Sequence, residues 1–439
     1  MTSDQPVSLI EERGDFVDCS EAESLSEQSA GLGGHLLYAT HAWLQYMTPP
    51  LYGSNQRYCG PRDEDIVRDG YLHYFKVPLG LYDIVDELAR RDLPHPDVFI
   101  AHIDAAYRNL PLGLERLKST RVMVLGDTHH LEKPLQKVIR YFDQEPYDLY
   151  LSDCKRHHDH FFQTIRPDAR IEFFPGLRNR FEARRFVSAK YPVVSMIGAL
   201  KGEFHPIRAE LHKIIQQADV PLIATGIPQR QAAAVYSNAL ININCSLNSE
   251  MNMRVMEVIS AGGLLLTDKL APETGIDQCF VDGEHYLSYR SPQDCVATIR
   301  ELLAKPQRAL RIARAGWERF RERYGICQRR QLLANLVAQV RSSTQSPAPP
   351  QIDSIWRSWI PLYEAVQECN RSGINKVQID FPVPVHVQLW FKPLARLKVA
   401  YDHSAAPAPN IVCPQFSTAT RDSTTVFRVT TSAGALANA

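Results

Sequence analysis

Arg254 and Glu257 form the first pair in this chain whose types and spacing could do chemistry. They lie in SLNSEMNMRVMEVISAGGLLLTD, residues 246–268, which is predicted to form a loop, a helix, a Gly-Gly turn and a buried strand. Side chains three residues apart share one face of a helix. A cation and a carboxylate therefore stand beside a helix start, where backbone N–H groups and the helix dipole favour an anion. The pattern predicts a site for a phosphorylated ligand that also carries hydroxyl groups.

The loop before this helix and the turn after it bear on the same site. Asn248 and Ser249 could cap the helix and leave neighbouring N–H groups pointing at phosphate. The alternative interpretation is an ordinary surface helix with an ion pair between Arg254 and Glu257. The tight Gly-Gly turn at 262–263 favours the site, because it holds the helix start close to the neighbouring loops.

A second polar group, LGDTHH at residues 125–130, follows a predicted strand in the first half of the chain. Asp127, His129 or His130 could act as a general base on a hydroxyl group, since histidine has an unperturbed pKa of about 6.5. The alternative is a structural loop, in which Asp127 or Thr128 caps the next helix and the histidines pack beside it.

The same region is rich in histidine, because CKRHHDHFF adds His157, His158 and His160. Histidine and carboxylate side chains are good ligands for zinc, iron or manganese, and GDTHH resembles the Gly-Asp-x-His of metallophosphoesterases. The other metal motifs of those enzymes do not occur in the sequence. A polar helix start that binds no metal is therefore the preferred interpretation.

Short apolar runs alternate with helical patterns over two successive stretches, residues 34–188 and 189–341. Alternation of this kind predicts parallel sheets covered by helices on both faces. Ligands of such sheets bind at the carboxyl ends of the strands. Both polar groups fall at strand ends, which predicts a site between two α/β units.

The ends of the chain have a different composition. Residues 1–33 are strongly acidic and are predicted to be a disordered leader. A Pro/Ser-rich linker at 342–351 precedes a small appended segment, 352–403, with a helical pattern and proline-interrupted strands and no assigned role. Residues 404–439 are rich in Ser, Thr, Ala and Pro and are predicted to be disordered.

Bulk composition excludes several classes of function. Lys plus Arg and Asp plus Glu are equal at 49 each, so no global charge draws the chain to nucleic acid or anionic lipid. The sequence contains no apolar run near the ~20 residues of a membrane helix and no signal-peptide pattern. The nine cysteines are scattered without a C-x-x-C pair. They favour a reduced, cytoplasmic location over a disulfide framework.

The 246–268 segment resembles the C-terminal signature of the GT-B glycosyltransferases. It is most similar to the "glycosyl transferases group 1" branch that includes spore-maturation-protein-like enzymes. VDGEHYLSYRSPQD and PQRALRIARAGWERFRERYG fit the same family, so the resemblance covers residues 190–335, and the first unit agrees only in layout. The resemblance implies an α/β fold with two facing Rossmann-like, doubly wound domains and a short extra C-terminal segment. Residues 34–188 would bind the acceptor, and 189–341 would bind the nucleotide-sugar donor.

By this resemblance Glu257 matches the second glutamate of the family's E-x7-E motif, which holds the donor ribose. The first glutamate would align with Ser249, with Glu250 one residue away, so the chain departs from the motif. The loop after the first strand of the second unit is expected to meet the donor diphosphate. The implied donor-binding residues are Gly198, Lys201, Arg208, Asn248, Ser249, Asn252, Arg254 and Glu257, and the catalytic candidates are Asp127, His129 and His130.

The predicted activity is transfer of a sugar from a nucleotide-sugar donor, a UDP- or GDP-sugar, to an acceptor hydroxyl group. No metal and no cofactor are expected. Two alternatives stay open, because a fold does not fix a reaction. One is a nucleotide-sugar epimerase or hydrolase on the same fold, and the other is a non-catalytic scaffold that binds a sugar nucleotide.

Overall fold

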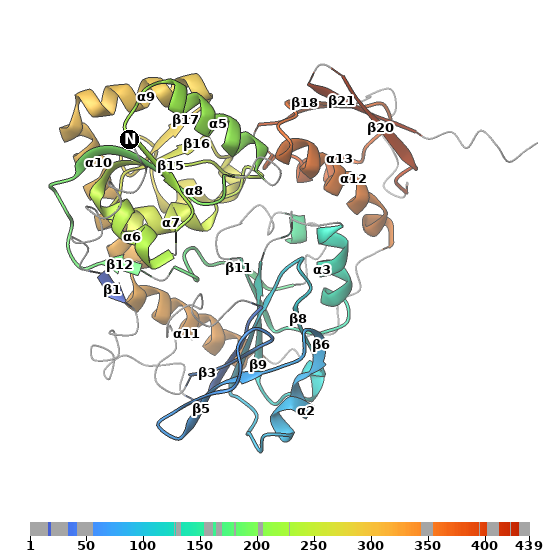
Figure 1. Cartoon of the computed structure of the whole chain (residues 1–439). Helices are drawn as coiled ribbons and strands as arrows, with labels where there is room; N and C mark the ends of the chain where they lie inside the picture. Colours follow the sequence, from blue (N-terminus) through green and yellow to red (C-terminus); the bar gives the residue numbers. More distant parts are fainter. Residues whose placement is uncertain are drawn as a thin grey trace, which may run out of the picture.

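The computed structural model places two parallel sheets and a smaller mixed sheet in separate parts of the molecule (Figure 1). The structure describes residues 16–18, 34–41, 56–126, 128, 133–152, 161–163, 169–179, 181–200, 205–227, 229–343, 354–394, 396–401, 412–421 and 423–429.

The first sheet has the strand order β11-β10-β9-β7-β2-β3-β5-β4, and all neighbours are parallel except β4 and β5. Its strands are β2 (Leu36–Ala39), β3 (Gln56–Gly60), β4 (Ile66–Arg68), β5 (Tyr71–Lys76), β7 (Val98–Ile103), β9 (Thr120–Leu125), β10 (Leu149–Ser152) and β11 (Ile171–Phe173). Every residue of β7 is buried, as expected of a central parallel strand covered on both faces. Helices α2 (Ile84–Ala89) and α3 (Pro134–Phe142), and the strand pair β6 (Gly80–Asp83) and β8 (Asn109–Leu112), complete this unit.

The second sheet is parallel throughout, with the order β14-β13-β15-β16-β17. Its strands are β13 (Tyr191–Ile197), β14 (Leu222–Thr225), β15 (Ala239–Asn244), β16 (Leu265–Asp268) and β17 (Leu287–Tyr289). Its helices are α5 (Pro206–Gln217), α6 (Gln229–Asn238), α7 (Met253–Ser260), α8 (Ile276–Cys279), α9 (Pro292–Ala304) and α10 (Pro306–Tyr324). Crossover helices and parallel strands confirm the predicted fold class, two Rossmann-like domains.

Helix α11 (Ile326–Ser342) returns from the second domain to the first (Figure 1). Leu333 and Val337 pack into a core cluster with Leu36 and Val98 of the first sheet, and Arg341 donates hydrogen bonds to Thr120 Oγ1 at 3.1 Å and to the Asp97 carbonyl. The predicted second unit, 189–341, therefore includes a helix that packs on the first unit. Its amphipathic pattern indicated a helix but not the core against which it packs.

The C-terminal segment forms a third folded unit, which corrects the prediction made for its last part. Its elements are α12 (Ser354–Arg371), β18 (Lys376–Ile379), α13 (Val385–Trp390), β19 (Lys398–Tyr401), β20 (Phe416–Arg421) and β21 (Thr424–Val429). The four strands form one sheet in the order β19-β18-β21-β20. The prediction that 404–439 is disordered is wrong for β20 and β21, whose β-branched residues favour strands and whose Phe427 is buried. Within the predicted leader, β1 (Phe16–Asp18) pairs with β12 (Phe181–Ala183).

This appended unit, defined here as residues 354–429, packs on the first domain. Tyr363 of α12 stacks on Phe161 with ring centroids 4.8 Å apart, and Trp390 meets the same ring edge-on at 4.9 Å. The Glu364 carboxylate accepts hydrogen bonds from the backbone N–H groups of Leu135 and Gln136 at 2.8 and 3.1 Å. It thereby satisfies orphan donors in the first turn of α3, and one apolar core joins the two units.

Candidate functional site

Asn252 begins the central helix of the candidate site, α7. Its side chain accepts a hydrogen bond from the Arg254 N–H at 3.2 Å, and its backbone is extended, as at an N-cap. The prediction that Asn248 or Ser249 caps this helix is therefore wrong. Both residues lie further up the loop, where their side chains accept hydrogen bonds from Asn370.

Arg254 is held over the end of β15 by a network of amides. Its Nη1 donates to Asn244 Oδ1 at 3.0 Å, and Asn252 Nδ2 donates to the same oxygen at 3.1 Å. Asn244 Nδ2 in turn donates to Thr267 Oγ1 of β16 at 3.0 Å. The carboxyl ends of two neighbouring strands thus fix the guanidinium beside the start of α7.

Arg208 and Arg254 converge on Gly198, the residue that follows β13. A Cβ atom on Gly198 would lie 2.3 Å from Arg254 Nη2 and 3.6 Å from Arg208 Nη1, and Gly198 has φ of +124°. Arg208 also donates to the carbonyls of Ala199 at 3.2 Å and Cys245 at 3.0 Å. A glycine and two cations from three elements therefore share one point.

The charges at this point favour an anion. Burial, together with the nearby charge of Arg254, lowers the pKa of Arg208 to about 10, so the side chain stays protonated at neutral pH. The Nε atoms of both arginines are buried without a hydrogen-bond partner among the described residues. Two adjacent guanidinium groups repel each other, and a bound phosphate would relieve that repulsion and take up their free donors.

Glu257 lies one turn along α7 from Arg254 and is half-buried. The charges of both residues act on one hydroxyl group, that of Tyr236. Burial raises the pKa of Tyr236 to about 12, while the charge of Arg254 lowers it and that of Glu257 raises it. The predicted cation and carboxylate therefore lie on the same side of α7, on the face toward α6.

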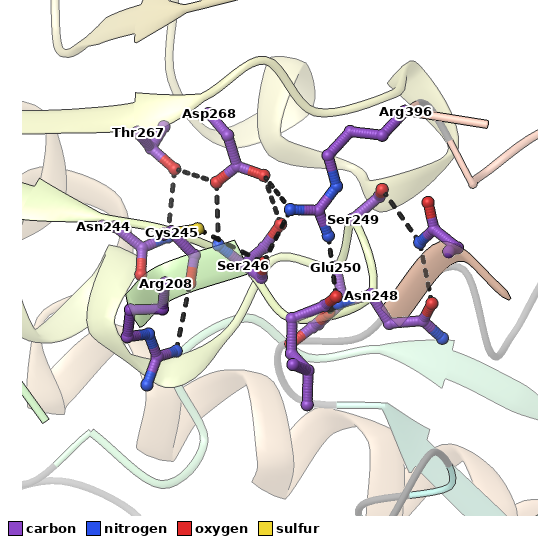
Figure 2. Close-up of polar contacts among 12 residues, drawn as sticks. Arg208, Asn244, Cys245, Ser246, Asn248, Ser249, Glu250, Thr267, Asp268 and Arg396 are labelled. Atoms are coloured by element: carbon purple, nitrogen blue, oxygen red, sulfur yellow. Dashed lines mark hydrogen bonds and ion pairs between the residues drawn. The ribbon is translucent and has the colours of Figure 1, made fainter. Parts of the chain in front are cut away.

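The loop before α7 is tightly folded (Figure 2). Ser249 has φ of +59°, a left-handed conformation that is uncommon for serine. The Asn248 N–H donates to the Glu250 carboxylate at 2.6 Å, and Glu250 is only 3% exposed. Ser246 donates both its N–H and its hydroxyl to the carboxylate of Asp268.

Several predicted residues fall outside the described part of the chain. These are Lys201, the catalytic candidates Asp127, His129 and His130, and the further histidines His157, His158 and His160. Within the described residues, Thr128 is buried, and no group of three or more His, Cys, Asp or Glu side chains could hold a metal ion.

A polar cluster at the carboxyl edge of the first sheet was not predicted from the sequence. His41, which follows β2, contacts Asp104, which follows β7, with His41 Nε2 3.1 Å from Asp104 Oδ2. Asp104 is fixed because its other oxygen accepts the Ala106 N–H at 3.0 Å. The ring of His102 lies 4.5 Å from that of His41, and Arg178 Nη1 lies 3.3 Å from His102 Nε2.

His41 is built to accept a proton. When Asp104 accepts the Nε2–H, the Nδ1 atom keeps its lone pair, and Nδ1 is buried with no hydrogen-bond partner among the described residues. Burial lowers the pKa of His41 below 6.5, partly offset by the charge of Asp104 and reinforced by nearby arginines. The imidazole is therefore neutral at pH 7, the form that can act as a base.

The segment 176–179 connects the two halves of the site. Ser260 Oγ of α7 donates to Asn179 Oδ1 at 3.4 Å, and a Cβ on Gly176 would lie 3.7 Å from Met256 Cγ of the same helix. Arg178 of this segment reaches His102. The histidine cluster and α7 thus lie on two sides of one short segment.

A comparison with known protein families matches part of this chain. Residues 213–335, which contain α7 and its loop, match the family described as "Glycosyl transferase-like". None of the curated proteins matches the sequence.

The solved structures found as similar share little sequence with this chain. HepE of Anabaena, solved with UDP and glucose, is 10% identical over 70% of this chain and 100% of its own, with a TM-score of 0.49. Sucrose-phosphate synthase from Thermosynechococcus elongatus is 9% identical over 70% and 99%, with a TM-score of 0.47. Trehalose 6-phosphate synthase from Burkholderia multivorans is 12% identical over 71% and 99%, with a TM-score of 0.46.

The family match covers only part of the site. Of the three residues that meet at the end of β13, Arg254 lies inside the matched segment, and Gly198 and Arg208 precede it. The matched segment is similar to glycosyltransferases, the class that the sequence resemblance implied. Among the described helices, none is long and apolar enough to span a membrane.

Proposed function

We propose that the chain transfers a hexosyl or related sugar from a UDP- or GDP-sugar to an acceptor hydroxyl group. The second domain binds the donor, and the first domain binds the acceptor. The observation that carries the proposal is the meeting of Arg208 and Arg254 at Gly198, beside the capped start of α7. The similarity of 246–268 to the spore-maturation-protein-like branch supports the same activity.

The two arginines account for departure of the nucleotide. In the reaction the bond from the anomeric carbon to the β-phosphate oxygen breaks, and negative charge builds on the nucleoside diphosphate. Cations already in position stabilise that charge without reorganisation. Because Arg208 and Arg254 supply two positive charges, we infer that the transfer needs no divalent metal. Glu257, one turn further along α7, is placed to accept hydrogen bonds from the ribose hydroxyl groups.

The acceptor side is assigned to His41 and Asp104. As the acceptor oxygen forms its bond to the anomeric carbon, it loses a proton, and neutral His41 Nδ1 takes that proton. Asp104 orients the ring and stabilises the imidazolium that results. The predicted candidates Asp127, His129 and His130 follow β9, the strand next to β7, so they remain proposals for the same side of the site.

A cytoplasmic location is part of the proposal. Among the described cysteines, Cys59, Cys245 and Cys295 are buried and form no disulfide. Buried reduced thiols of this kind suit a reducing compartment.

The experiment that tests the activity is release of nucleoside diphosphate from a panel of labelled nucleotide sugars, with and without candidate acceptors. Acceptor-dependent release that persists in EDTA supports a metal-independent transferase. Release or isomerisation without acceptor would instead indicate a hydrolase or an epimerase. Binding without turnover of any donor would indicate a scaffold.

The matched variants are Arg254→Ala and Arg311→Ala. Arg311 is an exposed arginine of α10 in the same domain. Loss of a charge-assisted contact of about 1.5–3 kcal/mol should weaken donor binding roughly 10- to 100-fold. Arg311→Ala should leave it unchanged. Equal donor affinity in both variants would contradict the proposed site.

A further inference from the structure

The appended unit reaches into the loop that precedes α7. Arg396 lies beside this loop in Figure 2, and Asn370 also contacts the loop. Both residues come from a unit that packs on the first domain. The loop they contact, residues 246–249, belongs to the second domain and leads directly into the donor-binding helix.

Arg396 binds the loop through its backbone. Its Nη1 donates to the Ser246 carbonyl at 3.1 Å, and its Nη2 donates to the Leu247 carbonyl at 2.7 Å. The same guanidinium lies 3.8 Å from Asp268 Oδ2. Burial alone would lower the pKa of Arg396, but the charge of Asp268 raises it overall, so this arginine stays charged. Since Asp268 also accepts the Ser246 N–H at 2.8 Å, the start of the loop is held from two sides.

Asn370, the penultimate residue of α12, binds the middle of the loop. Its Nδ2 donates to Asn248 Oδ1 at 2.8 Å and lies 3.3 Å from Ser249 Oγ. Ser249 has the left-handed φ of +59°, a conformation that persists only where surrounding contacts hold it. All three residues are buried, with exposures of 0%, 1% and 1% for Asn248, Ser249 and Asn370.

The held loop adjoins the proposed phosphate site directly. Asp268 accepts a hydrogen bond from Thr267 Oγ1 at 3.2 Å. Thr267 Oγ1 in turn accepts a hydrogen bond from Asn244 Nδ2. The side-chain oxygen of Asn244 accepts a hydrogen bond from Arg254. Cys245, at the start of the loop, supplies the carbonyl that binds Arg208. A shift of the loop would therefore move the supports of both guanidinium groups.

We propose that Arg396 and Asn370 are positioning residues for donor binding. The appended unit holds the 246–249 loop in the shape that keeps Arg208, Arg254 and the start of α7 in place for the diphosphate. The inference rests on the proposed donor site. It gives the C-terminal unit a role: it spans the two domains and completes the donor half of the site without touching the donor.

The test compares Arg396→Ala, Arg396→Lys and Asn370→Ala in the full-length protein, with Arg428→Ala as the control. Arg428 lies in the same unit and pairs with Asp380 at the surface. Calorimetric titration with UDP and GDP gives the dissociation constant, and steady-state kinetics give the donor KM and kcat separately. Losing two hydrogen bonds from a charged group should raise the dissociation constant and donor KM about tenfold or more, with kcat changed much less.

Further readouts separate positioning from general stability. Arg396→Lys keeps the charge but cannot bind two carbonyls with a planar fork, so it should recover only part of the affinity. If Arg396→Ala does not fold, as shown by loss of its cooperative melting transition, the donor affinity of Asn370→Ala is used instead, because that substitution removes only one amide group. If Asn370→Ala and Arg396→Lys bind the donor as tightly as the parent while Arg254→Ala binds it more weakly, the positioning role is wrong and the donor site stands. Unchanged affinity in Arg254→Ala as well would overturn the donor site itself.

Discussion

The guanidinium of Arg254 occupies the space that a side chain on Gly198 would need. A Cβ atom on Gly198 would lie 2.3 Å from Arg254 Nη2, far inside van der Waals contact, and the φ of +124° at Gly198 is itself a conformation for glycine. The glycine therefore does more than form a turn. It lets the cation of α7 approach the backbone at the end of β13, where the N–H groups and the guanidinium can face the same phosphate.

Gly198→Ala should therefore displace Arg254 and weaken donor binding about tenfold or more, as expected for a lost charge-assisted contact. Backbone strain at positive φ should also lower the free energy of unfolding by about 1–3 kcal/mol. Gly283→Ala is a matched control, because Gly283 also has positive φ, +88°, but a Cβ there meets nothing within 4 Å. Calorimetric titration and thermal melting would check both. If the two variants bind the donor equally well, the Cβ contact does not shape the site.

Local patterns in the sequence were enough to predict the helices and strands, but not to predict contacts between residues far apart in the chain. The alternation of strands and helices predicted both parallel sheets, and the Arg254–Glu257 spacing and the glycine-basic loop predicted residues that the structure brings together. Pairing of His41 with Asp104 could not be predicted, because the two residues follow different strands, β2 and β7, which become neighbours only in the sheet. Asn248 was predicted as a cap because nothing in the sequence reveals its distant partner, Asn370.

Glu257→Ala should weaken binding of the nucleotide sugar strongly while leaving the fold intact, because the half-buried carboxylate is proposed to accept two ribose hydroxyl groups. Each lost hydrogen bond to a charged group contributes about 1.5–3 kcal/mol, so the loss of two should weaken binding by roughly 100-fold or more. Glu257→Gln, which keeps one acceptor oxygen, should lose less. Binding of UDP, UMP and uracil should be compared in Glu257→Ala. The substitution should weaken the binding of UDP and UMP, which contain ribose, and leave the binding of uracil unchanged. Unchanged donor affinity and activity in Glu257→Ala would contradict the role of this residue.

The pH dependence of transfer should report His41. Burial lowers the pKa of His41 below 6.5, so the neutral base persists at neutral pH and is lost as pH falls through the lowered value. The profile of kcat/KM should therefore be flat from about pH 8 down to pH 6.5 and fall below it. His41→Gln should abolish this acidic limb and reduce kcat about 100- to 10,000-fold.

Asp104→Asn offers a second readout of the same dyad. The charge of Asp104 raises the pKa of His41, so its removal should move the acidic limb to still lower pH. The rate should also fall, because an amide no longer fixes the correct ring orientation. An acidic limb that stays in place in both His41→Gln and Asp104→Asn would assign the titrating base elsewhere, with His129 and His130 as the next residues to substitute.

Arg329 should be the most costly single residue to remove from the connection between the domains. It is 1% exposed, and it donates to the carbonyls of Gly176 at 2.7 Å, Asn179 at 2.9 Å and Tyr324 at 2.8 Å. These bonds tie α11 to the segment 176–179, which lies between α7 and the histidine cluster. The Gly176 carbonyl keeps a second donor, the Asn179 N–H at 2.8 Å. A buried carbonyl that loses its donor costs about 1–3 kcal/mol, so Arg329→Ala, which removes the donors to Asn179 and Tyr324, should lower the free energy of unfolding by at least about 2 kcal/mol.

Urea denaturation of Arg329→Ala, Arg329→Met and the exposed control Arg323→Ala would test this. Arg329→Met keeps most of the apolar stem and should remain clearly less stable than the parent, because the carbonyls of Asn179 and Tyr324 still lose the donors that Arg329 supplied. Since the 176–179 segment carries Arg178, which contacts His102, both Arg329 variants should also reduce kcat under conditions where they stay folded, and Arg323→Ala should change neither quantity. A methionine variant as stable and as active as the parent would show that packing of the stem, and not its hydrogen bonds, joins the two domains at this point.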